Sequence, residues 1–113
     1  MMDGHSLHRL TEEHLGRARE ESSGRSAVTV HGGREHHLRQ TLVALAGGRA
    51  LGEHESPDEG TLHVLHGRVR LRTGEETWEG EAGDFVKLPP ERHDLEALED
   101  SAILLTTAAR LAH

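Results

Sequence analysis

The sequence contains no cysteine and no tyrosine, and it has only one phenylalanine and one tryptophan. Without cysteine the chain has no disulfide framework, no thiolate zinc site and no cysteine nucleophile, so burial and hydrogen bonding alone must hold the fold. This absence fits a reducing cytosol. Because aromatic side chains are so scarce, the stacking platforms of proteins that bind single-stranded nucleic acids are also missing.

Basic residues are outnumbered by acidic ones. The chain has 13 Lys and Arg against 20 Asp and Glu, and its formal net charge is -7. A phosphate backbone would be repelled, so nucleic-acid binding is not expected. No apolar run approaches the length of a membrane span, and the first residues lack the basic start and apolar core of a signal peptide. We therefore expect one soluble, cytoplasmic domain from these 113 residues.

The segment from Ser6 to Glu21 is the one stretch that predicts a helix. Its apolar residues recur at helical spacing: Leu7, Leu10, Leu15 and Ala18. Ser6 is a suitable N-cap, and residues 21–26, ESSGRS, are typical of a linker. We expect the helix to pack on the outside of the main body. The predicted organisation is a helix and linker over residues 1–26 and a β domain over residues 27–113.

After residue 26 the pattern changes to short β-type runs joined by glycine turns. We expect strands at 27–30, 37–46, 61–66, 68–72 and 84–88, and two more that are split near residues 99 and 100. Arg68, Arg70 and Arg72 alternate with Val69 and Leu71, which predicts an antiparallel strand with the two apolar side chains inward. Roughly eight strands at this spacing are typical of all-β domains. The predicted class is mainly β, a sandwich or a jelly-roll barrel.

The segment from Gly52 to Gly67, GEHESPDEGTLHVLHG, is expected to form a hairpin that faces the core. His54 and Ser56 lie two residues apart, so their side chains point the same way in an extended chain. Leu62 and Val64 repeat this alternation after the turn.

Two blocks of the sequence resemble the cupin family. The first motif of that family matches a set of positions early in the chain: Gly52, His54, Ser56, Gly60 and Gly67. The second motif matches a later set: Gly83, Asp84, Pro89 and His93. The resemblance implies a cupin-type jelly-roll β-barrel preceded by one short α-helix, with His93 opposite His54 in one cavity. It also implies a homodimer, because small cupins commonly dimerise.

The resemblance further implies one divalent metal ion, which could be Mn, Fe, Ni, Cu or Zn. His54 and His93 match the first and last ligands, but Ser56 stands where the second histidine should be and Gly60 where the glutamate should be. Catalytic metal sites usually have three protein ligands and an open position, so a replacement ligand is needed. Glu59 is the possible replacement if the turn is distorted.

Other histidines near these motifs are less suited to the same site. His63 has the opposite parity to Leu62 and Val64, so we expect it to face away from the cavity. His66 shares the inward parity but lies too far along the strand to complete the site. His31, His36 and His37 lie in or near turns before the barrel, and their positions are left open.

Three functions are compatible with these features. The first is a barrel cavity that binds a small molecule, lined by His54, Ser56, Leu62, Val64, Leu71, Val86, His93 and Leu95. The second is a metal-dependent oxygenase or isomerase that uses His54, His93 and a third ligand. The third is a non-catalytic dimerisation module. Signatures of other chemistries are missing, since the sequence has neither a Walker-type phosphate loop nor a nucleophile elbow.

Overall fold

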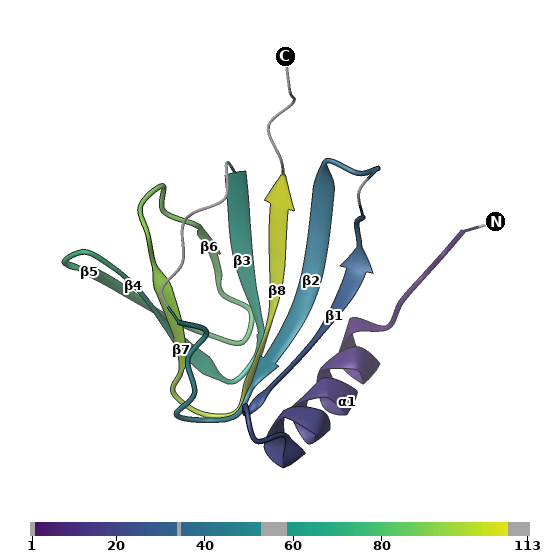
Figure 1. The fold of residues 1–113 in the computed structure, drawn as a ribbon, viewed down its shortest axis with the longest axis horizontal. Coiled ribbons are helices and arrows are strands. Elements are labelled where there is room, and N and C mark those ends of the chain that lie inside the picture. Colours follow the sequence, from purple (N-terminus) through teal and green to yellow (C-terminus); the bar gives the residue numbers. More distant parts are fainter. Residues whose placement is uncertain (1, 34, 53–58, 109–113) are drawn as a thin grey trace.

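The computed structural model describes residues 2–33, 35–52 and 59–108. Within these ranges the chain forms one helix and eight strands (Figure 1). The helix α1 spans Leu7–Glu20, and the strands are β1 (Arg25–His31), β2 (Leu38–Leu45), β3 (Glu59–His66), β4 (Arg68–Thr73), β5 (Glu76–Glu81), β6 (Phe85–Lys87), β7 (Asp94–Ala97) and β8 (Ser101–Ala108). The expected mainly β class with one N-terminal helix is confirmed.

The strands form two antiparallel sheets that face each other (Figure 1). One is five-stranded, in the order β1-β2-β8-β3-β6, and the other is three-stranded, in the order β5-β4-β7. From β3 onward every connection passes from one sheet to the other, except the β4–β5 hairpin. This repeated crossing is the topology of a jelly roll, in which two sheets share one interior.

The shared interior is built from aliphatic side chains on alternate strand positions. Its buried members come from both sheets and their connections: Val43, Leu45, Leu62, Val64, Val69, Leu71, Leu88, Leu95, Ala97 and Ile103. In β4 the predicted alternation is confirmed, because Val69 and Leu71 are buried while Arg70 reaches Glu79 at 3.1 Å on the other face. Burying one such side chain contributes about 1.5–3 kcal/mol.

Helix α1 packs against the outer face of the five-stranded sheet, as expected. The Ser6 side chain accepts a hydrogen bond from the Arg9 N–H at 3.2 Å, which confirms Ser6 as the N-cap. Leu15 and Ala18 pack against Ala44 of β2 and Ala102 of β8. No helix within the described ranges is long and apolar enough to cross a membrane.

Asp100 ties the helix to the turn between β7 and β8. Its carboxylate accepts hydrogen bonds from Arg19 Nε at 2.7 Å and from the Gly47 N–H at 2.8 Å. The Arg19 hydrogen bond, followed by that from Gly47, lowers the pKa of Asp100. The stability that this contact contributes is therefore present above the ordinary pKa of an aspartate and is lost as the pH falls through the lowered value.

Two expectations about the connections need correction. Strand β1 begins at Arg25, inside the expected linker. The hairpin expected over residues 52–67 is wrong where it can be followed, because β3 is flanked by β8 and β6, while Ala50 forms a bridge with Glu96 of β7. Because β8 and β6 occupy both edges of β3, no edge is left for a hairpin partner. Ala50, which precedes the residues outside the described ranges, pairs with the three-stranded sheet instead. The division of the chain at residue 26 stays a prediction.

Gly67 lies at the crossing from β3 to β4. Its φ of 81° is in the left-handed region, and a Cβ there would meet the Asp100 carbonyl oxygen and Ser101 Oγ. The Ser101 hydroxyl accepts a hydrogen bond from the Arg68 N–H at 3.1 Å and lies 2.7 Å from the Glu99 carbonyl oxygen, to which it donates. The crossing therefore depends on close contact between the two chain segments at a position that only glycine can occupy.

We predict that Gly67→Ala lowers the free energy of unfolding by about 2–3 kcal/mol, because a strained backbone and a steric overlap are combined. The matched control is Gly74→Ala, where φ is 52° but nothing lies within 4 Å of the added Cβ. In that control the free energy of unfolding should fall by only about 1 kcal/mol, which is the cost of the left-handed backbone alone. Urea unfolding measures both, and equal losses would contradict the close approach at Gly67.

Candidate functional site

The apolar residues predicted to line a cavity lie on the facing surfaces of the two sheets. Leu62 and Val64 of β3 are fully buried, as are Leu71 of β4 and Leu95 of β7, which face each other across the strand pair. Val86 of β6 is only partly buried and packs against them. Leu62, Val64 and Leu95 therefore form packed core, whereas Leu71 and Val86 lie where the core reaches its open margin.

A cavity of about 120 Å³ opens at this margin between the two sheets. Its lining combines apolar and polar side chains from β4, β5 and β6 and the segment that follows β6: Leu71, Thr73, Glu76, Thr77, Trp78, Val86, Lys87 and Pro89. Leu71 and Val86 are the two lining residues that the sequence predicted. Trp78, which pairs with Leu71 across β4 and β5, was missed because a lone tryptophan carries no motif.

Trp78 owes its position to a glycine. Gly80 shares its face of β5 with Trp78, and a Cβ on Gly80 would overlap the Trp78 indole. The indole therefore lies directly over Gly80, where it packs against the core and forms one wall of the cavity. An alternating glycine and aromatic pair is the only local signal that could have indicated this wall.

His93 is the one buried histidine of the predicted site that the structure describes. Its exposed fraction is 3%, and its Nδ1 lies 3.0 Å from the Glu91 carbonyl oxygen. Because a carbonyl can only accept, Nδ1 carries the proton, and Nε2 keeps the lone pair in the neutral ring. The contact thus fixes both the tautomer and the ring orientation, as is usual for histidines that act as ligands or polar contacts.

His93 and the cavity wall share one face of the three-stranded sheet. Arg72 pairs with Asp94 and Leu71 with Leu95, so alternation places Thr73 and His93 on the inner face with the two leucines. The Thr73 hydroxyl donates to the Arg92 carbonyl at 2.9 Å, which links the same two segments. The structure therefore places His93 on the same inner face as Leu71 and Thr73, two of the residues that line the cavity.

The other predicted polar positions do not complete a metal site in the part of the chain that can be described. His54 and Ser56 lie outside the described residues. Gly60 is buried on the inner face of β3 and offers no donor, whereas Glu59 is exposed on the opposite face. Among the described residues, no group of three or more His, Asp or Glu side chains could hold a metal ion.

The two histidines at the end of β3 have different outcomes. His63 has the predicted outward parity, because Leu62 and Val64 on either side of it are buried. The inward parity predicted for His66 is wrong. The register with β8 shifts between Val64 and His66, and this bulge turns the exposed His66 ring to the outer side. One extra residue in a strand reverses the faces of all that follow, which strict alternation cannot anticipate.

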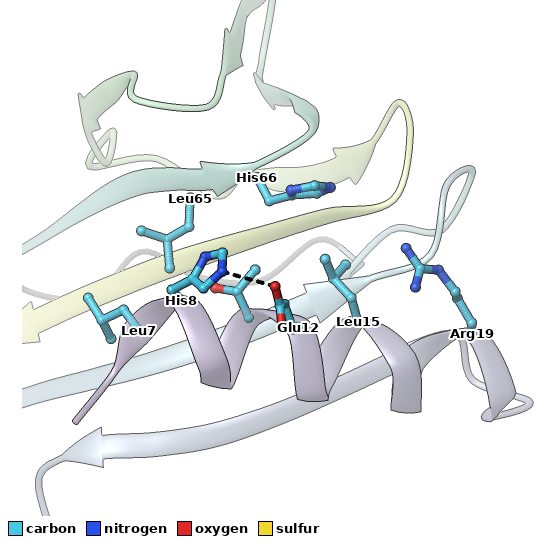
Figure 2. Close-up of a pocket in the computed structure, with 8 residues that line it drawn as sticks. Leu7, His8, Glu12, Leu15, Arg19, Leu65 and His66 are labelled. Atoms are coloured by element: carbon cyan, nitrogen blue, oxygen red, sulfur yellow. Dashed lines mark ion pairs between the residues drawn. The ribbon is translucent and has the colours of Figure 1, made fainter.

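His66 instead lines a groove of about 460 Å³ between α1 and the end of β3 (Figure 2). The apolar side chains of the groove are Leu7, Leu15 and Leu65. Its charged side chains are already paired, because His8 contacts Glu12 at 2.9 Å and Arg19 contacts Asp100 at 2.7 Å. The groove is larger than the cavity between the sheets, and Thr11 is its buried polar side chain.

Comparisons with known proteins identify the fold. No family model and no curated protein matches the sequence. Among solved structures, a conserved protein of unknown function from Streptococcus pyogenes is 25% identical, with 81% of this chain and 80% of that chain covered at a TM-score of 0.72. A cupin superfamily protein from Desulfitobacterium hafniense is 14% identical, with 76% and 78% covered at a TM-score of 0.70.

A larger enzyme shares the same architecture. The salicylate 1,2-dioxygenase from Pseudaminobacter salicylatoxidans is 16% identical and superposes with a TM-score of 0.74. The match covers 88% of this chain but 33% of that one. At these identities the similarity identifies the fold and leaves the activity to be argued from the site.

We predict that Gly80→Ala shifts the fluorescence emission of Trp78 to longer wavelength, because the added methyl group displaces the indole from its wall into solvent. Trp78 is the only tryptophan, so the signal has one source. Gly74→Ala, in the nearby β4–β5 turn with no neighbour within 4 Å, serves as the control and should leave the emission unchanged. Unchanged emission in Gly80→Ala would contradict the indole packing described above.

Proposed function

We propose that this chain, which has the cupin fold, binds a small molecule in the cavity between its two sheets. The observation that carries this proposal is the cavity lined by Leu71, Trp78 and Val86, at the end of the interior where the inner face also holds His93. Small-molecule sites are typically concave and apolar with a few placed polar groups, and this combination has that character.

The size and lining of the cavity limit the ligand. An apolar cavity of about 150 Å³ holds one benzene molecule, so the space of about 120 Å³ accepts a group of about six heavy atoms or fewer. The apolar walls favour a short aliphatic chain or a single ring. Lys87 and Glu76 line the same space, so a polar substituent of the ligand would meet charge there. A small, mainly apolar acid or alcohol is the ligand class that fits these features.

Val86→Phe should abolish binding, because the larger side chain fills the cavity. Phe85→Ala is the matched control, since Phe85 is the adjacent residue on the opposite face of β6 and is 63% exposed. The experiment titrates single-ring and short-chain acids and alcohols and follows the Trp78 indole N–H signal by NMR. We expect saturable shifts in the unmodified chain and in Phe85→Ala, and none in Val86→Phe.

A second variant guards against misfolding of Val86→Phe. Leu71→Ala enlarges the same cavity and should shift the preference toward larger probes. Binding that is unaffected by both substitutions, or no binding by any probe to the unmodified chain, would overturn the proposal.

A metal-dependent enzyme is the second candidate function. His93 favours it, because the ring is buried and the hydrogen bond from Nδ1 to the Glu91 carbonyl orients it, as is usual for metal-ligating histidines. The cupin-fold dioxygenase among the similar structures supports the same candidate. In such an enzyme the metal would polarise the substrate or activate dioxygen or water, and His93 and the sequence-predicted His54 would hold it. Gly60 has no side-chain atom that could bind a metal, so a third ligand must come from a further residue.

Elemental analysis of untagged protein tests this second candidate. An enzyme of this type should contain stoichiometric Mn, Fe, Ni, Cu or Zn that is lost in both His54→Ala and His93→Ala. Protein that holds no metal as purified, or that keeps this metal in His93→Ala, would contradict the candidate.

The homodimer stays a prediction. Its support in the structure is the exposed side chain of Phe85 on the outer face of the five-stranded sheet. His63 lies beside Phe85 on the neighbouring strand β3, and Leu104 of β8 lies beside His63. This surface lies on the opposite side of β6 from the cavity, so dimerisation there would leave ligand binding possible.

A further inference from the structure

Two histidine rings lie against each other at the turn between β1 and β2. His31 is the last residue of β1, and His36 lies in the turn that follows. Their ring centroids are 4.8 Å apart, and the ring planes are inclined by 44°. Both residues are exposed. The turn lies on the far side of the molecule from β4 and β5, so this pair is separate from the cavity between the sheets (Figure 1).

The backbone holds the two rings together. The register of β1 and β2 shifts between Thr29 and His31, so His31 pairs with Gln40. The His36 N–H then donates to the Gly33 carbonyl at 3.1 Å and turns the chain back toward β1. Gly32 has a φ of 139°, and a Cβ there would lie 3.1 Å from Arg39 Cγ. A glycine conformation and a strand bulge therefore set the proximity of the rings.

We propose that His31 and His36 form a surface binding site for a divalent transition-metal ion. With metal–nitrogen bonds of about 2.0–2.1 Å, the centroids of two imidazoles on one ion lie about 4.5–5.2 Å apart, for bond angles from about 90° to about 109°. The observed separation of 4.8 Å falls within this interval. Because both side chains are exposed, each ring can turn about its Cβ–Cγ bond, which leaves the centroid separation nearly unchanged and can point one nitrogen of each ring at a shared ion.

The chemistry of the pair selects the ion. Imidazole nitrogen suits Cu²⁺, Ni²⁺ and Zn²⁺, and Cu²⁺ binds nitrogen ligands most strongly among the first-row divalent ions. No third His, Asp or Glu in the described part of the chain converges on the pair, so water would complete the coordination. The net charge of -7 favours the approach of any cation. The site is therefore an open, exchangeable Cu²⁺ site with two protein ligands.

Calorimetric titration of the full chain with Cu²⁺ tests this proposal, together with electron paramagnetic resonance of the bound ion. We expect one site of highest affinity, with hyperfine coupling to two nitrogens. Removing a direct ligand should weaken it by at least the roughly 10- to 100-fold that loss of an outer-shell partner costs. His31→Ala and His36→Ala should each show that loss, and their far-ultraviolet circular dichroism should match the unmodified chain because both residues are exposed.

Matched histidine substitutions separate this site from others on the chain. His8→Ala removes an exposed histidine of α1, and His93→Ala removes the buried one, and both variants should retain the site. Affinity that is unchanged in His31→Ala or in His36→Ala would overturn the proposal. Loss of the tightest site in His93→Ala would also overturn it, because that ion would then lie inside the barrel.

Discussion

The structure depends on one shared apolar interior between two sheets, filled almost entirely by aliphatic side chains. With no cysteine the chain has no disulfide to hold the sheets together, so burial of these side chains and hydrogen bonds must do so. Leu62 and Val64 on one sheet and Val69 and Leu71 on the other supply the contact surfaces at alternate positions. The crossing at Gly67 closes one end of this interior by direct contact with the β7–β8 turn. At the other end packing stops at Val86, and the space that remains is the cavity.

This arrangement explains why the candidate site is small and mainly apolar. Of the positions that resemble the cupin metal motifs, Gly60 has no side chain to act as a ligand, and it is buried on the inner face of β3. His93 keeps its buried position and its fixed tautomer. The interior thus combines packed aliphatic side chains with one oriented imidazole. The histidine pair at the β1–β2 turn is independent of this interior, because it is set by loop geometry on the far side of the molecule (Figure 1).

Local signals in the sequence predicted the fold more completely than the site. The alternation in β4, the Ser6 cap and the outward His63 each depend on neighbouring residues, and all three are confirmed. The predicted orientation of His66 was wrong because a bulge shifts the register between Val64 and His66. A prediction from strict alternation does not allow for such an inserted residue. The cavity at Trp78 forms only where β4, β5 and β6 come together, and the meeting of His31 with His36 depends on a strand bulge and a turn. Spacing along the chain cannot supply such information.

The central claim is that the interior is packed at one end and open at the other, beside Trp78. Xenon enters apolar cavities of this size without needing a polar partner, so it reports the space directly. We expect the NMR spectrum of xenon-equilibrated protein to show shifts concentrated on the methyl groups of Leu71 and Val86 and on the Trp78 indole, with Val43 and Leu45 in the packed region unaffected. Absence of shifts at those three residues, or equal shifts throughout the core, would contradict the account.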